Sequence, residues 1–159
     1  MNDFLELTAK DNHKFSAYLS HPKDKPKAGI VILQEIFGVN KHIREVADLY
    51  AKNGFLVIAP SLFDRIEKNV ELSYDESGVS KGRKLKDLCD ENVLKDIETA
   101  ISLVSSAGKV GVIGYCWGGS LSWKAACEKL NLSASVCYYG GDIPSLKNNQ
   151  PNCNVLTHF

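Results

Sequence analysis

Hydrophobic residues along the chain follow two spacings, one typical of strands and one typical of helices. Residues 4–8 and 14–19 are short extended runs around the turn-forming Asp11-Asn12-His13, which predicts an antiparallel hairpin. The apolar run at residues 29–33 is rich in β-branched side chains and predicts a strand buried on both faces. Four later runs predict further strands of a parallel sheet: residues 55–59, 110–113, 134–139 and 154–157.

Other segments carry the spacing of amphipathic helices. Apolar residues fall on one helical face between Asn40, which can cap the start, and Gly54, which follows the end. A second set predicts one long helix over residues 84–107, and a further helix is expected at about residues 119–130. The polar stretch 64–83 lacks strong periodicity, so we expect a long loop or a loosely held short helix there, of the kind that often borders a site.

The alternation of strands and helices predicts the fold class. We expect one domain over residues 1–159, built as a three-layer α/β/α sandwich around a mostly parallel sheet. Residues 29–59 form a strand-helix-strand unit with short connections, which predicts a right-handed crossover. A chain of 159 residues is long enough to bury one such core.

Composition and charge narrow the class of partner. Nineteen basic residues balance nineteen acidic ones, and no basic cluster is interleaved with aromatic residues. Nucleic acid and anionic membranes are therefore not expected, and a small neutral or weakly charged molecule fits better. The first ten residues lack the basic and apolar regions of a secretory signal, and no apolar run is long enough to span a membrane, which predicts a cytoplasmic location.

Cysteine and histidine positions argue against a disulfide framework and against a metal site. The five cysteines are odd in number and irregularly spaced, which favours a reducing compartment, and there is no Cys-x-x-Cys. The four histidines form no pair at metal-ligand spacing, so no metal site is expected. Four cysteines are interpreted as small packing residues: Cys89, Cys127, Cys137 and Cys153.

The fifth cysteine, Cys116, lies in Gly114-Tyr-Cys-Trp-Gly-Gly119, directly after the strand predicted at residues 110–113. A Gly-x-nucleophile-x-Gly run between a strand and a helix predicts a nucleophile elbow, a strained turn that projects one side chain above the strand's carboxyl end. Gly114 and Gly118 stand where the two backbones approach too closely for a Cβ. Cys116 is therefore the candidate nucleophile, and its position at a helix N-terminus predicts a thiol pKa below the ordinary value.

Other interpretations of this glycine-rich turn fit less well. A dinucleotide fingerprint requires Gly-x-Gly-x-x-Gly and an acidic residue about twenty positions later. The glycines here, at positions 111, 114, 118 and 119, have a different spacing, and the next strand ends without a carboxylate. The Gly-Lys-Ser/Thr of a phosphate loop and the cation of a cysteine-phosphatase loop are absent. No cofactor is expected.

Two backbone donors and one carboxylate are expected beside Cys116. The Trp117 N–H can stabilise an oxyanion, and the second donor in this architecture comes from the loop after an early strand, where the Ile36 N–H is the candidate. Glu35, at the end of that strand, is placed to accept the thiol proton or to orient the nucleophile. A structural role for Glu35, as a helix cap or a lysine partner, is an open alternative, and Trp117 can equally be a core residue.

These residues resemble the dienelactone hydrolase (carboxymethylenebutenolidase) family of the α/β-hydrolase superfamily. Two segments, Gln34-Glu-Ile-Phe-Gly-Val-Asn40 and Gly111-x-x-Gly-Tyr-Cys-Trp-Gly-Gly119, are similar to that family's motifs and occur in the family's order. The resemblance extends over nearly the whole chain. It implies a Cys-His-Asp triad, hydrolysis of a small dienelactone-type lactone or ester through a cysteine acyl-enzyme, and no cofactor.

The same resemblance assigns residue roles and exposes a difference. It implies that Cys116 is the nucleophile and that Glu35 is the glutamate that contacts it. The implied oxyanion donors are the Ile36 and Trp117 N–H groups. In the family the triad aspartate and histidine follow the nucleophile, and residues 154–159 resemble the strand just before that aspartate. We therefore expect a C-terminally truncated domain that lacks the last strands and helix of the full fold.

Asp142 and His158 are the residues available to replace the missing triad members. Asp142 follows a predicted strand tip, but His158 is expected inside the terminal strand, where it would point into a layer and not over Cys116. The resemblance also implies arginines that bind the substrate. Arg65 and Arg83 are the available candidates, and neither lies in a recognisable motif.

Two functions from different classes follow. The first is a hydrolase of small esters or lactones, whose turnover is strongly reduced without the histidine. The second is a catalytically incomplete fragment or non-catalytic binding relative, in which an exposed sheet edge allows self-association. A redox-sensing thiol at Cys116 is a third alternative.

Overall fold

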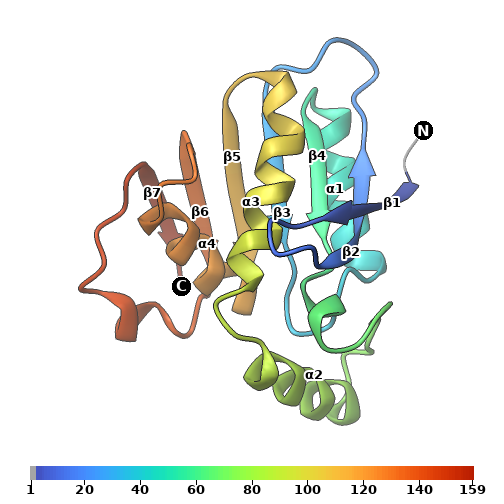
Figure 1. The fold of residues 1–159 in the computed structure, drawn as a ribbon, viewed down its shortest axis with the longest axis vertical. Helices are drawn as coiled ribbons and strands as arrows, with labels where there is room; N and C mark the ends of the chain where they lie inside the picture. The colour runs from blue at the N-terminus through green and yellow to red at the C-terminus, as the bar shows by residue number, and fades with distance from the viewer. Residues whose placement is uncertain (1–2) are drawn as a thin grey trace.

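The computed structural model describes residues 3–159 and folds them into one mixed sheet with helices on both faces (Figure 1). The strands are β1 (Asp3–Thr8), β2 (Lys14–Ser20), β3 (Gly29–Leu33), β4 (Leu56–Pro60), β5 (Val110–Tyr115), β6 (Ala134–Tyr138) and β7 (Asn154–His158). The helices are α1 (Lys41–Lys52), α2 (Glu76–Leu88), α3 (Val93–Val104) and α4 (Trp117–Cys127). Three short 3-10 turns lie at Leu62–Arg65, Ser105–Ala107 and Ile143–Leu146.

The sheet has the strand order β1-β2-β4-β3-β5-β6-β7. β1 and β2 form the predicted antiparallel hairpin, and β2 is also antiparallel to β4. The strands from β3 to β7 are all parallel to one another. The predicted mostly parallel sheet is therefore confirmed, with β3, α1 and β4 as its strand-helix-strand unit.

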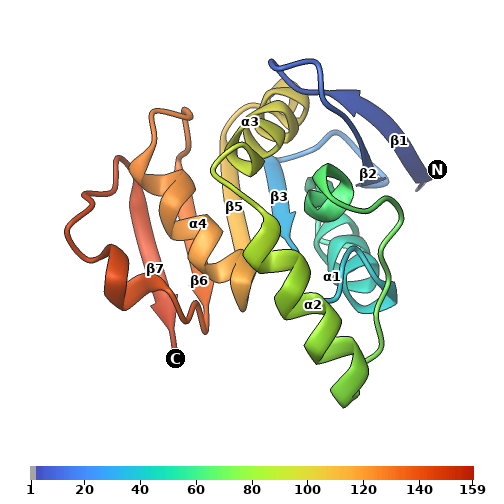
Figure 2. The ribbon, with the colours of Figure 1, turned by 60° about the horizontal axis from the view of Figure 1, so that its bottom comes forward.

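Alternate residues of the central strands divide the core into two clusters, one on each face of the sheet. Val31 and Leu33 of β3 belong to the cluster that includes residues of α3 and α4. Ile30 and Ile32 belong to the cluster that includes residues of α1. The arrangement is the predicted three-layer α/β/α sandwich (Figures 1 and 2).

The first helix begins as the sequence predicts. The Asn40 side chain accepts a hydrogen bond from the Ile43 N–H at 3.2 Å, which caps α1. At the other side of the sheet, β7 is the edge strand of the described chain and leaves Leu156 exposed. Self-association at this edge stays a prediction.

The prediction of one helix over residues 84–107 is wrong, because two helices, α2 and α3, occupy residues 76–104. The break lies at residues 89–92, where the Asp90 side chain accepts a hydrogen bond from the Asn92 N–H at 2.8 Å and so favours a local turn over the helix. The apolar spacing continued across this break and hid it. The last predicted helix is also shifted, since α4 begins at Trp117 and ends at Cys127.

The start of α2 corrects the expectation of a loop or loosely held short helix at residues 64–83. Gly78 and Gly82 made this stretch look like a loop, but both glycines are helical and permit close packing. A Cβ on Gly78 would lie 1.9 Å from the Ser73 carbonyl oxygen, and one on Gly82 would lie 2.1 Å from that of Ile36. These glycines are therefore where α2 packs against neighbouring loops.

No helix within residues 3–159 has the length and apolar character needed to cross a bilayer. The cytoplasmic location stays a prediction.

Candidate active site

Cys116 occupies a strained turn between β5 and α4. Its φ of 56° and ψ of −117° are unusual for a residue with a side chain and cost about 1–3 kcal/mol. The Cys116 N–H donates to the Tyr138 carbonyl oxygen at 3.0 Å, and the Cys116 carbonyl accepts from the Ser120 N–H at 3.2 Å. The tight, strained turn predicted from the sequence is therefore present, and its backbone is held from both sides.

Glycines on both sides of Cys116 allow the turn to form. A Cβ on Gly114 would lie 1.9 Å from the Gly118 carbonyl oxygen. A Cβ on Gly118 would lie 2.3 Å from the Leu33 carbonyl oxygen of β3. Both distances are far below van der Waals contact, which confirms that the two glycines are required by close approach of the backbones.

A pocket of about 200 Å³ opens beside Cys116. It lies where β5 and β6 end, the usual position of a binding site in a parallel sheet. The pocket is lined by Ile36, Arg83, Lys86, Cys116, Trp117, Ser120, Tyr139, Gly141 and Asp142. The helix α2, at the lower end of the molecule in Figure 2, supplies Arg83 and Lys86.

The surroundings of the half-buried Cys116 raise its thiol pKa, so the prediction of a lowered pKa is wrong. Burial is the largest cause, because it disfavours the charged thiolate. The nearby Trp117 N–H opposes this by favouring charge on the sulfur, and the positive charge of Lys86 acts in the same direction. The negative charges of Glu35 and Asp142 raise the pKa further. Cys116 is therefore held as a neutral thiol that needs a base to react.

Glu35 lies close enough to act on Cys116 through its charge, and its carboxylate also binds two tyrosines. The Tyr74 hydroxyl donates to Oε2 at 2.8 Å, and the Tyr139 hydroxyl donates to Oε1 at 3.4 Å. Burial and the negative Glu35 raise the pKa of both tyrosines to about 12, so both hydroxyls keep their protons. The two tyrosines thus orient the carboxylate at the end of β3.

The two predicted backbone donors come from different parts of the chain. The Trp117 N–H lies near enough to the Cys116 sulfur to lower the thiol pKa, while the Trp117 indole is buried and stacks on Phe63 at a centroid distance of 5.1 Å. The core interpretation of Trp117 therefore holds for its side chain, without excluding a role for its N–H. The Ile36 N–H donates to no acceptor among residues 3–159, and the Ile36 side chain lines the pocket.

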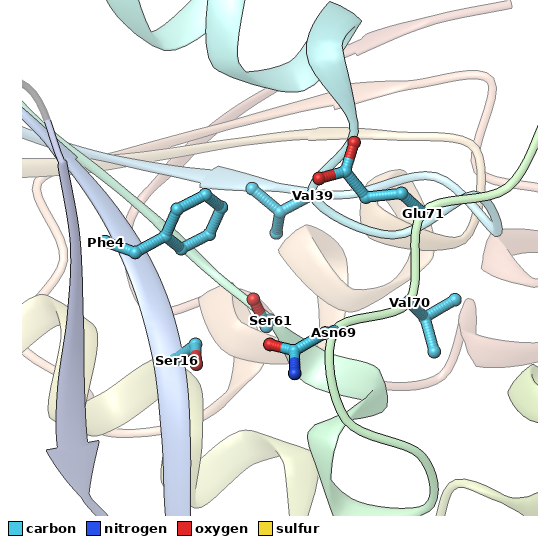
Figure 3. Close-up of a pocket in the computed structure, with 7 residues that line it drawn as sticks. All are labelled: Phe4, Ser16, Val39, Ser61, Asn69, Val70 and Glu71. Atoms are coloured by element: carbon cyan, nitrogen blue, oxygen red, sulfur yellow. The ribbon is translucent and has the colours of Figure 1, made fainter.

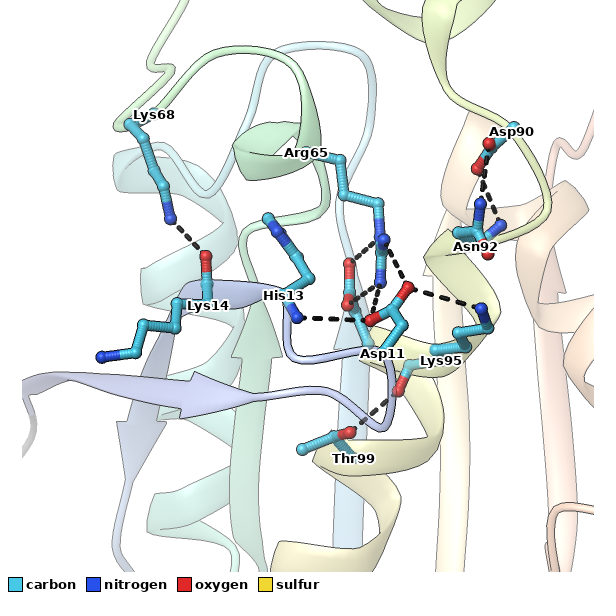
Figure 4. Close-up of polar contacts among 10 residues, drawn as sticks. Asp11, His13, Lys14, Arg65, Lys68, Asp90, Asn92, Lys95 and Thr99 are labelled. Atoms are coloured by element: carbon cyan, nitrogen blue, oxygen red, sulfur yellow. Dashed lines mark hydrogen bonds and ion pairs between the residues drawn. The ribbon is translucent and has the colours of Figure 1, made fainter.

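Other residues singled out in the sequence are divided between the pocket and the rest of the molecule. Arg83 and Asp142 line the pocket. Arg65 is held elsewhere by Asp96 and Asp11, and Figure 4 shows it pointing to Asp11 at the tip of the β1–β2 hairpin. His158 lies in β7, as predicted, and its ring stacks on Tyr138 at 4.8 Å.

None of the nine residues that line the pocket is a histidine.

The remaining cysteines fit the packing interpretation to different degrees. Cys137 is fully buried, and burial raises its pKa and that of the half-buried Cys89 to about 11. Cys127 and Cys153 are half-buried, with thiol pKa values also raised by burial.

Sequence reasoning missed Tyr74, Tyr139 and Lys86 as neighbours of the site. Tyr74 lies in the stretch expected to border a site, so its region was identified although its contact with Glu35 was not. Tyr139 precedes two glycines at a strand end, which is a sequence signal for a turn, and in the structure its φ is 39°. Lys86 was expected in one long helix over residues 84–107, whereas it lies in α2. No sequence signal would have placed it at Cys116.

A second pocket, of about 220 Å³, lies between the hairpin and the loop before α2 (Figure 3). It is lined by Phe4, Ser16, Val39, Ser61, Asn69, Val70 and Glu71. The single charged side chain in this lining, Glu71, already pairs with Arg44 at 2.7 Å. Neither cysteine nor histidine faces this pocket. Among residues 3–159, no group of three or more His, Cys, Asp or Glu side chains is arranged to hold a metal ion.

Comparison with known proteins gives a consistent family. The model of the dienelactone hydrolase family matches residues 15–159. Carboxymethylenebutenolidase 1 of Cupriavidus pinatubonensis is 34% identical over 149 residues, which cover 88% of this chain and 62% of the relative. Carboxymethylenebutenolidase of Pseudomonas putida is 34% identical over 146 residues, which cover 88% of this chain and 61% of that relative. The chain thus spans about three fifths of the length of these curated relatives.

A solved structure supports the fold. A dienelactone hydrolase-like promiscuous phosphotriesterase from metagenomic libraries superposes with a TM-score of 0.74. At 21% identity over 98% of this chain and 67% of the other, this likeness concerns the fold alone. Because the family model covers the hairpin's second strand, both motifs and all later elements of the sheet, this chain belongs to the dienelactone hydrolase family.

Proposed function

We propose that this protein hydrolyses a small lactone or ester through an acyl-enzyme on Cys116. The observation that carries the proposal is the strained turn at Cys116, which presents the thiol to a pocket with the Trp117 N–H at the sulfur. The curated relatives are named carboxymethylenebutenolidases, which points to a dienelactone-type substrate.

In the proposed acylation, Cys116 gives its proton to Glu35 while the sulfur attacks the carbonyl carbon. A base is needed because burial raises the thiol pKa. The carbonyl π electrons move to oxygen, and the resulting tetrahedral oxyanion collapses and expels the alkoxide. The alkoxide takes the proton from Glu35, leaving a thioester on Cys116. Water then attacks the thioester, and transfer of a water proton through Glu35 regenerates the thiol and frees the carboxylic acid.

Two backbone groups are proposed to hold the oxyanion. The Trp117 N–H lies near enough to the sulfur to lower the thiol pKa, and the Ile36 N–H has no other acceptor within residues 3–159. Donors that point to the position of a developing charge stabilise it without reorganisation, and each is worth on the order of 3 kcal/mol. The close contact of Gly118 with Leu33 keeps the end of β3 and the turn after β5 together, and so fixes both donors.

Arg83 is the proposed binding residue for a substrate carboxylate. It lines the pocket, is exposed, and forms no ion pair within residues 3–159. A planar guanidinium can bind a carboxylate through two parallel hydrogen bonds. Arg65 is not available for this task because two aspartates already hold it.

The test compares the wild type with Cys116→Ala on an activated aryl ester and on dienelactone. We expect Cys116→Ala to lose the reaction, and we expect mass spectrometry to find the acyl group on the wild-type peptide that carries Cys116. Because no histidine lines the pocket, acylation of the 159-residue chain should outpace hydrolysis of the thioester and give a burst of about one equivalent. Cys153→Ala, at a half-buried thiol outside the pocket, is the matched control and should keep the burst.

The opposite result favours a different class of function. Equal rates for the wild type and Cys116→Ala, with no acyl adduct on Cys116, would refute the hydrolase proposal. The chain would then be a binding relative of the family, and the pocket would serve recognition only.

A further inference from the structure

An ion pair crosses the rim of the Cys116 pocket, and the reaction proposed above does not use it. The Lys86 Nζ of α2 lies 3.1 Å from Oδ2 and 3.2 Å from Oδ1 of Asp142, which follows β6. Both side chains line the same pocket as Cys116. They are 30% and 43% exposed, so the charges are screened only in part.

The position of Asp142 is fixed by the turn that carries Cys116. The Asp142 N–H donates to the Ser120 Oγ at 3.1 Å, and the Asp142 carbonyl accepts from the Ser145 hydroxyl at 2.7 Å. Ser120 itself donates its N–H to the Cys116 carbonyl. The backbone of Asp142 is therefore held in place by these hydrogen bonds. Its carboxylate in turn holds the flexible Lys86 side chain at a defined place in the pocket that contains the thiol.

We propose that Lys86, held by Asp142, is a positioning residue that stabilises negative charge on the Cys116 sulfur, and that Asp142 limits this effect by neutralising the lysine. The proposal rests on the proposed function in one respect, namely that Cys116 is the reacting group. An ammonium near a partly buried sulfur favours the thiolate, and a carboxylate at the same place disfavours it.

The groups that face Cys116 come from several elements. Glu35 follows β3, Arg83 and Lys86 belong to α2, and Tyr139 and Asp142 follow β6. Lys86 and Asp142 act on the thiol pKa in opposite directions, the lysine lowering it and the aspartate raising it. Removal of one partner therefore leaves the other charge uncompensated.

The experiment measures the rate of Cys116 alkylation by iodoacetamide against pH, followed by mass spectrometry of the peptide that carries Cys116. The reagent is neutral, so a change of charge at residue 86 or 142 acts on its reaction mainly through the thiolate fraction. We expect Lys86→Gln to move the midpoint to higher pH and to slow alkylation near pH 8 about threefold. Asp142→Asn should move the midpoint to lower pH by a similar amount, and the double variant should return close to the wild type.

The matched control is Lys81→Gln on the same helix. Lys81 pairs with Glu67 at 2.6 Å, and neither residue lines the pocket. This variant should keep the wild-type midpoint. Loosening of α2 would move the alkylation midpoints of all variants in one direction. Opposite shifts of the midpoint for Lys86→Gln and Asp142→Asn therefore distinguish an electrostatic role from a structural one.

Three results would overturn the proposal: unchanged midpoints, shifts of the same sign in both single variants, or an equal shift in Lys81→Gln. Alkylation requires no turnover, so this outcome is independent of ester hydrolysis. Opposite shifts in a protein without Cys116-dependent hydrolysis would refute the proposed function and keep the role of Lys86. Cys116-dependent hydrolysis with unchanged midpoints would refute the role of Lys86 alone.

Discussion

Two clusters of charged side chains, one around Arg65 and one around Lys86, use the same chemistry in different surroundings. Arg65 forms a two-point contact with Asp96, at 2.8 and 2.7 Å, and a further pair with Asp11 at 3.0 Å. The Arg65 side chain is 12% exposed and that of Asp96 is fully buried. Lys86 has the single carboxylate of Asp142 and stands at the mouth of a pocket.

The difference separates a cluster that holds the fold together from one that remains available for chemistry. Arg65 joins the 3-10 turn Leu62–Arg65 to the hairpin tip and to α3, and Figure 4 shows Lys95 reaching Asp11 from the other side. Burial raises the pKa of Asp96, although Arg65 opposes this, while the Arg65 guanidinium lowers the pKa of Asp11. The Arg65 guanidinium already binds Asp11 and Asp96, so a ligand would have to displace one of these carboxylates.

The Cys116 pocket derives its order from the backbone instead. Close contacts at Gly114 and Gly118 fix the turn, whereas the surrounding charged side chains are exposed or half-buried. An arginine in the right part of the sequence is therefore not a binding residue by its type alone. Its partners and its burial decide whether it serves stability or a ligand.

The largest expected effect is that of Arg65→Met. This change leaves the buried Asp96 carboxylate without its cation, which should lower the free energy of unfolding by about 3–5 kcal/mol. Urea unfolding followed by circular dichroism measures it. Arg83→Met, at an exposed arginine, is the control and should stay within about 0.5 kcal/mol of the wild type. A loss below about 1 kcal/mol for Arg65→Met would remove the distinction between the two clusters.

A smaller loss is expected for Gly118→Ala, which tests the backbone as the source of order at the site. The new Cβ would meet the carbonyl oxygens of Leu33 and Gln34 at 2.3 and 2.5 Å, and overpacking of this kind costs about 1–3 kcal/mol. The same urea titration measures the loss, and it should be accompanied by faster alkylation of a less ordered Cys116. Gly141→Ala is the control, because its Cβ would meet nothing within 4 Å. Equal stability of the two variants would mean that the close backbone contact at Gly118 does not order the site.

The smallest effect on stability is expected for Lys86→Met. The ion pair with Asp142 is half-exposed, so its loss should change the free energy of unfolding by no more than about 0.5 kcal/mol. Thermal unfolding of Lys86→Met, Arg65→Met and the wild type under the same conditions measures the difference in stability directly. A destabilisation above about 1 kcal/mol would mean that Lys86 is a structural residue like Arg65.

Much of the fold could be predicted because its signals are local. The hairpin, the buried strands and the Asn40 cap of α1 each depend on a few neighbouring residues. The break between α2 and α3 could not be predicted in this way, since apolar spacing continues across residues 89–92 while an aspartate turn interrupts the helix. Gly82 also misled the prediction, because the close contact it permits is with Ile36, far away in the sequence.

The sequence by itself determined the elbow at Cys116, since the Gly-x-Cys-x-Gly spacing dictates a strained turn wherever a strand meets a helix. Only the tertiary structure decided the ionisation of its thiol. Burial sets the direction of the pKa shift, and Lys86 and Asp142, which are 56 positions apart in the chain, act on it in opposite directions. Backbone strain follows from adjacent residues, whereas desolvation and charge interactions depend on distances in space, which the order of residues does not contain.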